Sequence, residues 1–200
     1  RDKSISKTNN IAFIKKVKKR TNRLPLQYIT KVGHFYSRPF YVSKGVLIPR
    51  QETEILVEKV LKTLRGEDNV SCLDMCSGSG CIGITLALEN DCFKKVILSD
   101  VSKKAFLCSE KNIKIFNLKK RCTTILSKFF SNIPNIKFDI ICSNPPYINE
   151  AEYPLIEKDV KDFEPKLALV SKDKGLLHFK KIAQGARAFL KPNGLLFFEV

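Results

Sequence analysis

The 200-residue sequence predicts an α/β protein built on a mostly parallel sheet. Short apolar runs typical of strands alternate with longer amphipathic segments typical of helices, and this alternation predicts a parallel sheet with helices on both faces. A second observation is that three of the apolar runs end in a polar side chain, at Asp74, Asp100 and Asn144. Because ligands of such sheets bind beyond the carboxyl ends of the strands, we expect these side chains along one edge.

The first quarter of the chain predicts two segments that precede the main domain. Residues 1–27 are basic with few apolar positions, and we expect the end of a helical region or a linker. Residues 28–50 carry the runs "HFYSRPFYV" and "GVLIP", with Ser37 to Pro39 as the turn signal, and predict a β-hairpin. Residues 51–200 are expected to form the main domain, with its last strands continuing beyond Val200.

The main domain is predicted to begin with the helix "QETEILVEKVLKTLRG", with Ile55, Leu56, Val60 and Leu64 on one buried face. Strands and helices follow in turn. In order, they are the strand "VSCLD", the helix "CIGITLALEN", the strand "KKVILSD", the helix "SKKAFLCSEKNIKIF", the strands "CTTILS" and "FDIICSN", the helix "GLLHFKKIAQGARAFL" and the strand "GLLFFEV".

The composition limits the partners that the chain is expected to have. A formal charge of +16 favours attraction to phosphates, but lysine is spread over nearly every segment, as in an ordinary solvated surface. We therefore expect at most a weak attraction to RNA or the ribosome, and no DNA partner. No apolar run approaches the roughly 20 residues that span a bilayer, so no membrane partner is expected.

The seven cysteines are predicted to be reduced and buried, because their number is odd and most lie in apolar segments. They form no pair of the CxxC type, and His34 and His178 stand alone. No metal site is expected from this pattern.

A glycine-rich turn and a carboxylate together predict a nucleoside ligand. After Asp74 comes "MCSGSG", which places Gly78 and Gly80 just before a helix. Glycines let the backbone approach a ligand, and a helix N-terminus favours an anionic group such as a carboxylate. Asp100 closes the next strand about 20 residues later, where a ribose diol is held in this architecture. The alternatives are an ordinary strand-to-helix turn and a helix cap near Ser102.

The stretch Asn144-Pro145-Pro146-Tyr147 follows an apolar strand and predicts a grip for a planar amino group. The asparagine side chain offers one acceptor and two donors, and the prolines lack N–H groups while keeping their carbonyls. The Asn144 oxygen and the Pro145 carbonyl can therefore accept the two hydrogens of an –NH₂ group. Tyr147 supplies an aromatic face or a hydroxyl to the same flat group. The alternative is a plain turn.

The motifs "DMCSGSG", "LSDVS" and "SNPPYI" resemble those of class I methyltransferases that use S-adenosylmethionine. Together with "LPLQYI" and "LIPRQETE" upstream and "FEPKLAL" downstream, they resemble the release-factor glutamine methyltransferases, also called the HemK family. The resemblance covers residues 24–200 and implies a Rossmann-like fold preceded by a remnant of an N-terminal helical domain. It also implies methyl transfer to the side-chain amide of the glutamine in the Gly-Gly-Gln motif of class I peptide chain release factors, in the cytoplasm or in a eukaryotic organelle.

The resemblance also assigns candidate site residues. The cofactor-binding candidates are Asp74, Met75, Cys76, Ser77, Gly78, Asp100, Phe129 and Asn144. The substrate-binding candidates are Asn144, Pro145, Pro146 and Tyr147, and the catalytic candidates are Asn144, Pro145 and Tyr147.

The sequence departs from the family pattern at four places. Cys76 stands where the family usually has glycine, Gln51 replaces a proline, and Lys128 and Phe129 replace an acidic residue and a tryptophan; the usual final hairpin would lie beyond residue 200. Two alternative functions are carried forward. One is an adenine or guanine amino methyltransferase, which would use the same asparagine motif on a flipped base. The other is a non-catalytic relic of the fold that binds RNA or a protein.

Overall fold

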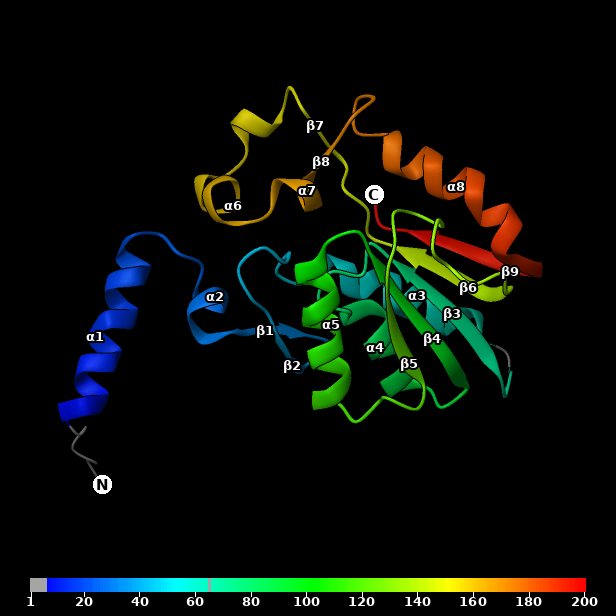
Figure 1. Cartoon of the computed structure of the whole chain (residues 1–200), viewed down its shortest axis with the longest axis horizontal. Coiled ribbons are helices and arrows are strands. Elements are labelled where there is room, and N and C mark those ends of the chain that lie inside the picture. The colour runs from blue at the N-terminus through cyan, green and yellow to red at the C-terminus, as the bar shows by residue number, and fades with distance from the viewer. Residues whose placement is uncertain (1–6, 65) are drawn as a thin grey trace.

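The computed structural model describes residues 7–64 and 66–200, so residues 1–6 of the predicted helical segment and Arg65 of the predicted helix over residues 51–66 lie outside it. A five-stranded sheet forms the centre of the molecule (Figure 1), with strand order β5-β4-β3-β6-β9 and every neighbouring pair parallel. The strands are β3 (Val70–Met75), β4 (Phe93–Asp100), β5 (Cys122–Leu126), β6 (Phe138–Ser143) and β9 (Leu190–Phe198). The predicted α/β class is confirmed.

Helices cover both faces of this sheet. The helices α3 (Glu52–Thr63), α4 (Cys81–Glu89) and α5 (Lys103–Ile115) pack on one face, and α8 (Leu177–Phe189) packs on the other. Successive side chains of a strand point to opposite faces, and the core follows this rule. Cys72 of β3 belongs to the cluster under α3 and α4, whereas Leu73 belongs to the cluster with Ile182 of α8. The apolar strand runs of the sequence are thus buried on both sides.

The order of the strands determines where a ligand can bind. From β3 the chain continues to β4 and β5 on one side, and then returns to place β6 and β9 on the other side. The point between β3 and β6 is therefore a topological switch point, where a crevice opens beyond the strand ends. Met75 pairs with Ser99 of β4 and with Ser143 of β6, so the residues that follow these three lie at one edge.

A β-hairpin precedes the sheet, as predicted. It joins β1 (Val32–Phe35) to β2 (Arg38–Tyr41) through Tyr36 and Ser37, which have φ angles of 49° and 58°. Two successive residues in this left-handed region are typical of the type I′ turn that fits the twist of a hairpin. The predicted turn at Ser37 to Pro39 is wrong, because Pro39 lies within β2 opposite His34.

The buried face of α3 differs from the prediction. Ile55 is 58% exposed, while Thr53 and Val57 are buried together with Leu56 and Val60. The helix packs against both α4 and β9, so its buried stripe is shifted toward Thr53. A polar side chain is thereby brought into the interior close to the strand ends.

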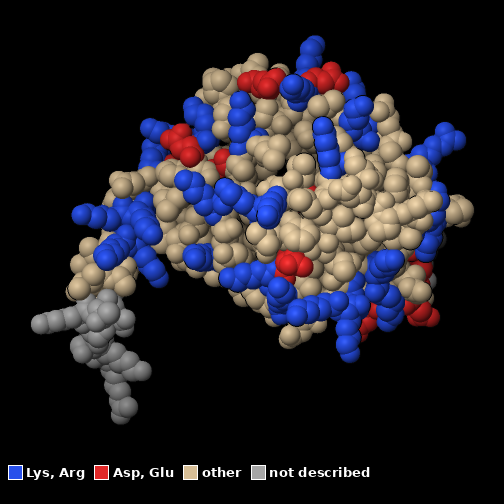
Figure 2. All heavy atoms as spheres, in the orientation of Figure 1, with Lys and Arg blue, Asp and Glu red and all other residues tan. Residues whose placement is uncertain are grey.

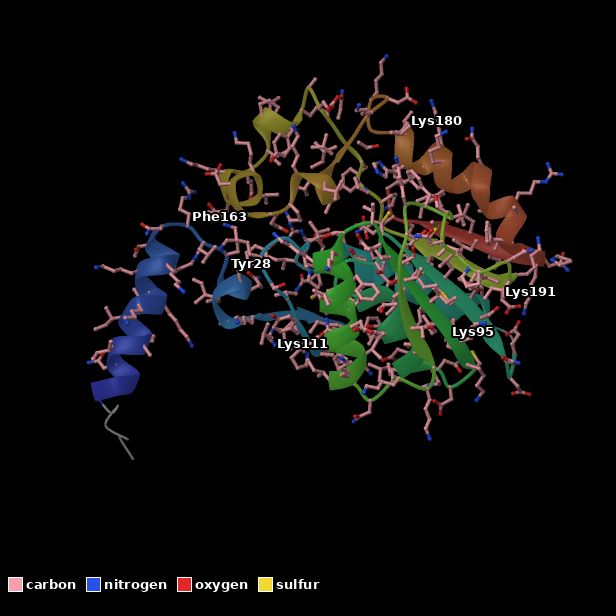
Figure 3. The ribbon with its side chains drawn as sticks, in the orientation of Figure 1. Tyr28, Lys95, Lys111, Phe163, Lys180 and Lys191 are labelled. Atoms are coloured by element: carbon pink, nitrogen blue, oxygen red, sulfur yellow. The ribbon has the colours of Figure 1, made fainter. Side chains whose placement is uncertain are left out.

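The segment between β6 and α8 folds over the strand ends. It contains β7 (Ile148–Asn149), the 3₁₀ turn η1 (Tyr153–Leu155), α6 (Lys158–Phe163), α7 (Lys166–Leu169) and β8 (Val170–Ser171). Two N-terminal helices, α1 (Lys7–Thr21) and α2 (Leu26–Thr30), lie beside it (Figure 1). Phe163 packs against a small cluster that contains Tyr28 (Figure 3), and Asp159 accepts hydrogen bonds from Arg20 and Arg23.

The surface shows basic side chains without a single basic patch on the face that Figure 2 displays. Lysine and arginine are spread over this face, with acidic side chains between them. In the described part of the chain no helix is both long and apolar enough to cross a bilayer. All seven cysteines are free thiols, and all except the half-buried Cys76 are buried, as predicted.

Candidate functional site

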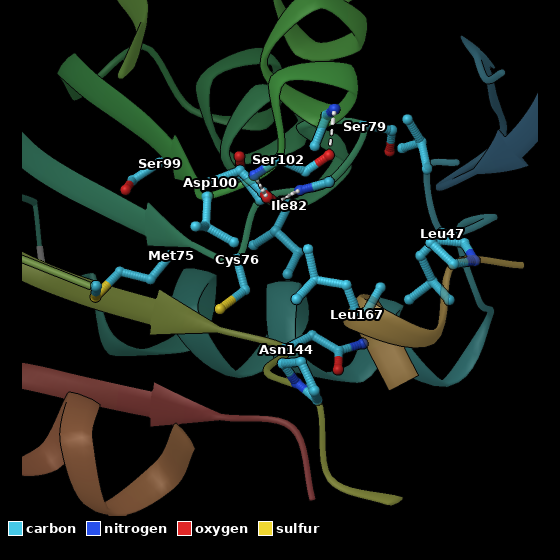
Figure 4. A pocket seen from close by; sticks show the side chains of 18 of the residues that line it. Leu47, Met75, Cys76, Ser79, Ile82, Ser99, Asp100, Ser102, Asn144 and Leu167 are labelled. Atoms are coloured by element: carbon cyan, nitrogen blue, oxygen red, sulfur yellow. Dashed lines mark hydrogen bonds between the residues drawn. The ribbon is translucent and has the colours of Figure 1, made fainter. Parts of the chain in front are cut away.

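A cleft opens beyond the carboxyl ends of β3, β4 and β6 (Figure 4) and brings most of the predicted site residues together. Those that line it are Met75, Cys76, Ser77, Gly78, Asp100, Phe129, Asn144 and Pro146. Three predicted residues are not part of the lining, namely Asp74, Pro145 and Tyr147. The cleft therefore joins the glycine-rich turn to the asparagine motif, which are about 65 residues apart in the sequence.

Glycine is needed at the two positions of the turn, Gly78 and Gly80, for different physical reasons. Both have positive φ angles, 55° at Gly78 and 81° at Gly80. A Cβ at Gly80 would meet Ile84 at 3.0 Å, so packing requires glycine there. A Cβ at Gly78 would meet no atom within 4 Å. Since Gly78 faces open space in the cleft, its lack of a side chain leaves room for a ligand rather than for the protein core.

Asp100 connects the glycine turn to the next helix. Its Oδ2 accepts a hydrogen bond from the Gly78 N–H at 2.9 Å, and its Oδ1 accepts one from the Ser102 N–H at 2.8 Å. Burial raises the pKa of this carboxyl, and the backbone N–H groups that it accepts from oppose the rise. Each oxygen keeps a second lone pair, so Asp100 can still accept hydrogen bonds from a ligand hydroxyl. Ser102 also caps α5 by accepting from the Ala105 N–H, so the cap alternative is present beside the ligand site.

Asp74 lies below the floor of the cleft. It is fully buried, and its Oδ2 accepts a hydrogen bond from the Gly83 N–H in the first turn of α4 at 2.9 Å. Its Oδ1 has no hydrogen-bond partner among the described residues. Burial raises the pKa of Asp74 to about 7. The carboxyl thus anchors the start of α4 beneath the turn, and its contact with a cofactor stays a prediction.

Cys76 occupies a backbone conformation that favours glycine. Its φ angle is 56°, which costs a residue with a Cβ about 1–2 kcal/mol. Its side chain lines the cleft, and burial raises the pKa of the thiol to about 12. The thiol is therefore protonated at neutral pH. The departure from glycine noted in the sequence thus places backbone strain and a sulfur atom in the lining of the cleft.

Phe129 and His178 form an aromatic part of the cleft wall. Their ring centroids are 5.5 Å apart with a tilt of 49°, and both residues line the cleft. His178 Nδ1 lies 2.8 Å from the Oγ of the buried Ser171, and burial lowers the pKa of the imidazole. A neutral imidazole and a phenyl ring offer flat faces to a planar base.

Asn144 is oriented by a residue from a different part of the chain. Its Nδ2 donates a hydrogen bond to the Oγ1 of Thr53 at 3.1 Å, and both residues line the cleft. Thr53 is 3% exposed and belongs to the "IPRQETE" motif. Because the amide nitrogen is engaged with Thr53, the amide oxygen is left as an acceptor. The strand end below is fixed as well, since Ser143 Oγ donates to the Met75 carbonyl at 2.8 Å.

The two prolines and the tyrosine sit at different depths. Pro145 and Pro146 are buried, whereas Tyr147 is 51% exposed. The Pro145 carbonyl has no hydrogen-bond partner in the described part of the chain. Gly175 packs against this turn so closely that a Cβ there would lie 2.2 Å from the Tyr147 carbonyl oxygen. The loop before α8 therefore holds the backbone that follows the prolines.

The outer wall of the cleft depends on a buried carboxylate. Glu164, whose side chain is 3% exposed, forms an ion pair with Arg50. The other Glu164 oxygen accepts a hydrogen bond from the Ile48 N–H at 3.0 Å. Ile48 and Arg50 line the cleft, as does Leu167 of α7 (Figure 4). One glutamate thus joins the segment before α3 to the segment after α6.

Sequence reasoning missed several of these residues. Thr53 could have been noticed as a polar residue on the apolar face of a predicted helix, next to Leu56 and Val57. Glu199, which directly follows β9 but does not line the cleft, was also missed. The rule that identified Asp74, Asp100 and Asn144 at strand ends applies to it as well. The pairing of Arg50 with Glu164 has no local signal, because 114 residues separate the two.

A parallel sheet with a glycine-rich turn and an asparagine motif at one edge is typical of class I methyltransferases, and comparisons with known proteins agree with this class. The methyltransferase small domain family matches residues 50–162. Among solved structures, the T. thermophilus 16S rRNA N2 G1207 methyltransferase in complex with AdoMet and guanosine gives a TM-score of 0.59 at 20% identity, covering 84% of this chain and 40% of that one. At this identity the likeness concerns the fold alone, and it agrees with the predicted class I methyltransferase architecture.

Curated relatives narrow the family. A release factor glutamine methyltransferase from Leptospira interrogans is 39% identical over 204 residues, covering 100% of this chain and 70% of that protein. One from Clostridium acetobutylicum is 40% identical over 186 residues, covering 90% of this chain and 64% of that protein. The chain belongs to the methyltransferase small domain family and, within it, to the family of the release factor glutamine methyltransferases. It spans 50–64% of the length of the Clostridium, Mycoplasma and Fusobacterium relatives.

Proposed function

We propose that this protein transfers a methyl group from S-adenosylmethionine to the side-chain amide nitrogen of the glutamine in the Gly-Gly-Gln motif of a class I peptide chain release factor. One observation carries the proposal: Asn144, its amide nitrogen engaged by Thr53, lines the same cleft as the glycine-rich turn and Asp100. The relatives at 39–43% identity are named release factor glutamine methyltransferases, which supports a release factor glutamine as the acceptor.

The described residues fit the cofactor. Gly78 leaves space that a side chain would fill, Asp100 keeps lone pairs for ribose hydroxyls, and Phe129 offers a ring to the base. When bound, S-adenosylmethionine supplies an electrophilic methyl group on a sulfonium. The Cys76 side chain also lines the cleft at this turn.

The chain's own residues act on the acceptor amide. An amide nitrogen is a poor nucleophile because its lone pair is delocalised into the carbonyl. In the proposed mechanism, the Asn144 Oδ1 and the Pro145 carbonyl accept the two hydrogens of the acceptor –NH₂ group, which increases electron density on nitrogen and fixes its direction. Orientation and preorganised dipoles would supply most of the acceleration, without a covalent intermediate. The nitrogen loses one proton on methylation, and this proton passes to solvent.

The test uses three acceptors with a labelled methyl donor. The protein is incubated separately with a release factor, with a variant of that factor whose Gly-Gly-Gln glutamine is alanine, and with ribosomal RNA. Label is expected on the first acceptor alone. Label on RNA would instead support the amino methyltransferase alternative. No donor binding by calorimetry would support the non-catalytic relic. The expected weak attraction to RNA is measured separately, as binding of the protein to the same RNA.

A further inference from the structure

Glu199 lies beside Asn144 at the carboxyl edge of the sheet. β6 and β9 pair in parallel with Ser143 opposite Phe198, and the Glu199 N–H donates to the Ser143 carbonyl at 3.1 Å. The residues that follow the two strands, Asn144 and Glu199, are therefore neighbours. Glu199 does not line the cleft, so it stands behind the asparagine rather than in contact with a ligand.

The Glu199 carboxyl lies close to the side chains of Thr53 and Asn144 and forms no ion pair with the described residues. Its Oε2 is buried and has no hydrogen-bond partner among the described residues. Burial raises its pKa, and the charge of Glu52 adds to the rise. Hydrogen bonding from Thr53 and Asn144 and the charge of Arg50 oppose the rise. Because burying a polar atom without a partner is costly, a carboxyl in this position calls for an explanation.

The direction of the hydrogen bonds supplies that explanation. Thr53 Oγ1 accepts from Asn144 Nδ2 at 3.1 Å, so its own hydrogen is free to be donated elsewhere. Asn144 thus donates to Thr53, and both Thr53 and Asn144 have a hydrogen to offer the nearby Glu199 carboxyl, which can only accept when it is ionised.

We propose that Glu199 and Thr53 are positioning residues that hold the Asn144 amide in one of its two orientations, with Oδ1 turned toward the cleft. This inference rests on the proposed function, in which Oδ1 accepts a hydrogen of the acceptor amide. An asparagine flipped by 180° would present its own –NH₂ group to the acceptor –NH₂ group, and two donors cannot pair. The ionised form of Glu199 opposes the flip, because the flip would turn the Asn144 oxygen toward a carboxylate that has no hydrogen to donate.

Kinetics of matched variants test the proposal. Thr53→Val removes the hydroxyl at nearly constant shape, and Glu199→Gln replaces a pure acceptor with a group that can also donate. Both are expected to lower kcat about 10- to 100-fold, the scale of a misplaced reacting group, with donor affinity unchanged by calorimetry. Thr53→Ser keeps the hydroxyl and should restore most of the rate. The matched controls lie on α3, the helix that carries Thr53: Thr63→Val at a half-buried position and Glu58→Gln at an exposed one. Both control variants should behave as wild type.

A second readout needs neither donor nor acceptor. The side-chain amide signal of Asn144 is identified in a ¹⁵N spectrum as the one lost in Asn144→Ala. Its hydrogens are expected to exchange slowly with water in the wild type, and faster in Thr53→Val and in Glu199→Gln. Because this measurement uses the protein alone, it separates failure of the positioning role from failure of the proposed reaction.

The pH profile gives the third readout. Because the pKa of Glu199 is raised, kcat should decline on the acid side at a pH above the ordinary glutamate value, as the carboxyl gains a proton. This limb should be absent in Glu199→Gln and present in Glu58→Gln. Wild-type rates and unchanged amide exchange in both Thr53→Val and Glu199→Gln would overturn the proposal, whatever acceptor is methylated.

Discussion

The two halves of the cleft are built in different ways. The donor half is local: the turn from Cys76 to Gly80 follows one strand, and Asp100 reaches it from the adjacent strand. The acceptor half is assembled from distant segments, since Thr53 and Asn144 are 91 residues apart. A local half depends on backbone shape, whereas an assembled half depends on tertiary packing. Mutations in the donor half should therefore change the affinity for the donor, whereas mutations in the acceptor half should change turnover.

The largest effect is expected from Asn144→Ala. Removing this one preorganised acceptor should lower kcat about 10²-fold or more. The affinity for S-adenosylmethionine, measured by calorimetry, should change little, because the turn and Asp100 stay in place. Steady-state methylation of a release factor measures the first quantity. Full activity of this variant would show that the acceptor half does not work through Asn144.

The next effect is expected from Asp100→Asn in the donor half. The carboxylate accepts from the Gly78 and Ser102 N–H groups, one on each oxygen, and an amide can accept on one side only. The substitution also removes the charge that would accept from a ribose hydroxyl of the donor, and losing a hydrogen bond to a charged group costs about 1.5–3 kcal/mol, which corresponds to roughly 10- to 100-fold weaker donor binding. Calorimetry with the methyl donor alone, without an acceptor, measures this affinity. If binding stayed at the wild-type level while turnover fell, the division of the cleft into two halves would be wrong.

The same difference between local and assembled parts explains what the sequence could predict. The order of strands and helices, the hairpin and the residues Cys76, Gly78, Asp100 and Asn144 could be placed from short patterns, because strand ends of a parallel sheet meet at one edge. Patterns of this kind describe neighbours in the chain. The helical spacing of Thr53 before Leu56 and Val57 gives a hint of its side, but it could not show how deeply Thr53 is buried, since the buried stripe of α3 depends on β9, which follows it by more than 120 residues.

The depth of individual residues was also beyond short patterns. Asp74 and Asp100 end or nearly end adjacent strands, yet Asp74 is fully buried under α4 while Asp100 reaches the cleft. The distinction comes from the close packing of Gly83, where a Cβ would lie 3.1 Å from the Cβ of Asp74. Helix-to-strand distance therefore decides which carboxylate can meet a ligand.

A smaller effect is expected from Glu164→Gln, which tests the packing of the acceptor half. The substitution keeps one acceptor for the Ile48 N–H but removes the charge that pairs with Arg50. We expect the free energy of unfolding to fall by about 1–2 kcal/mol, since Arg50 is partly exposed and can be hydrated. Urea denaturation measures this change. The KM for the release factor should rise while donor affinity stays constant; a loss of donor affinity instead would mean that the wall serves both halves.

The smallest effect, and one of opposite sign, is expected from Cys76→Gly in the donor half. Glycine removes the strain of a Cβ at a φ of 56°, about 1–2 kcal/mol, but its greater freedom in the unfolded chain cancels part of that gain, about 0.5–1 kcal/mol. Stability should therefore change by no more than about 1.5 kcal/mol. The opened cleft should bind S-adenosylmethionine several-fold more tightly, as measured by calorimetry. Cys76→Ala is the matched control, because it removes the sulfur and keeps the strained Cβ. If alanine improved affinity as much as glycine, sulfur volume rather than backbone shape would limit this half of the cleft.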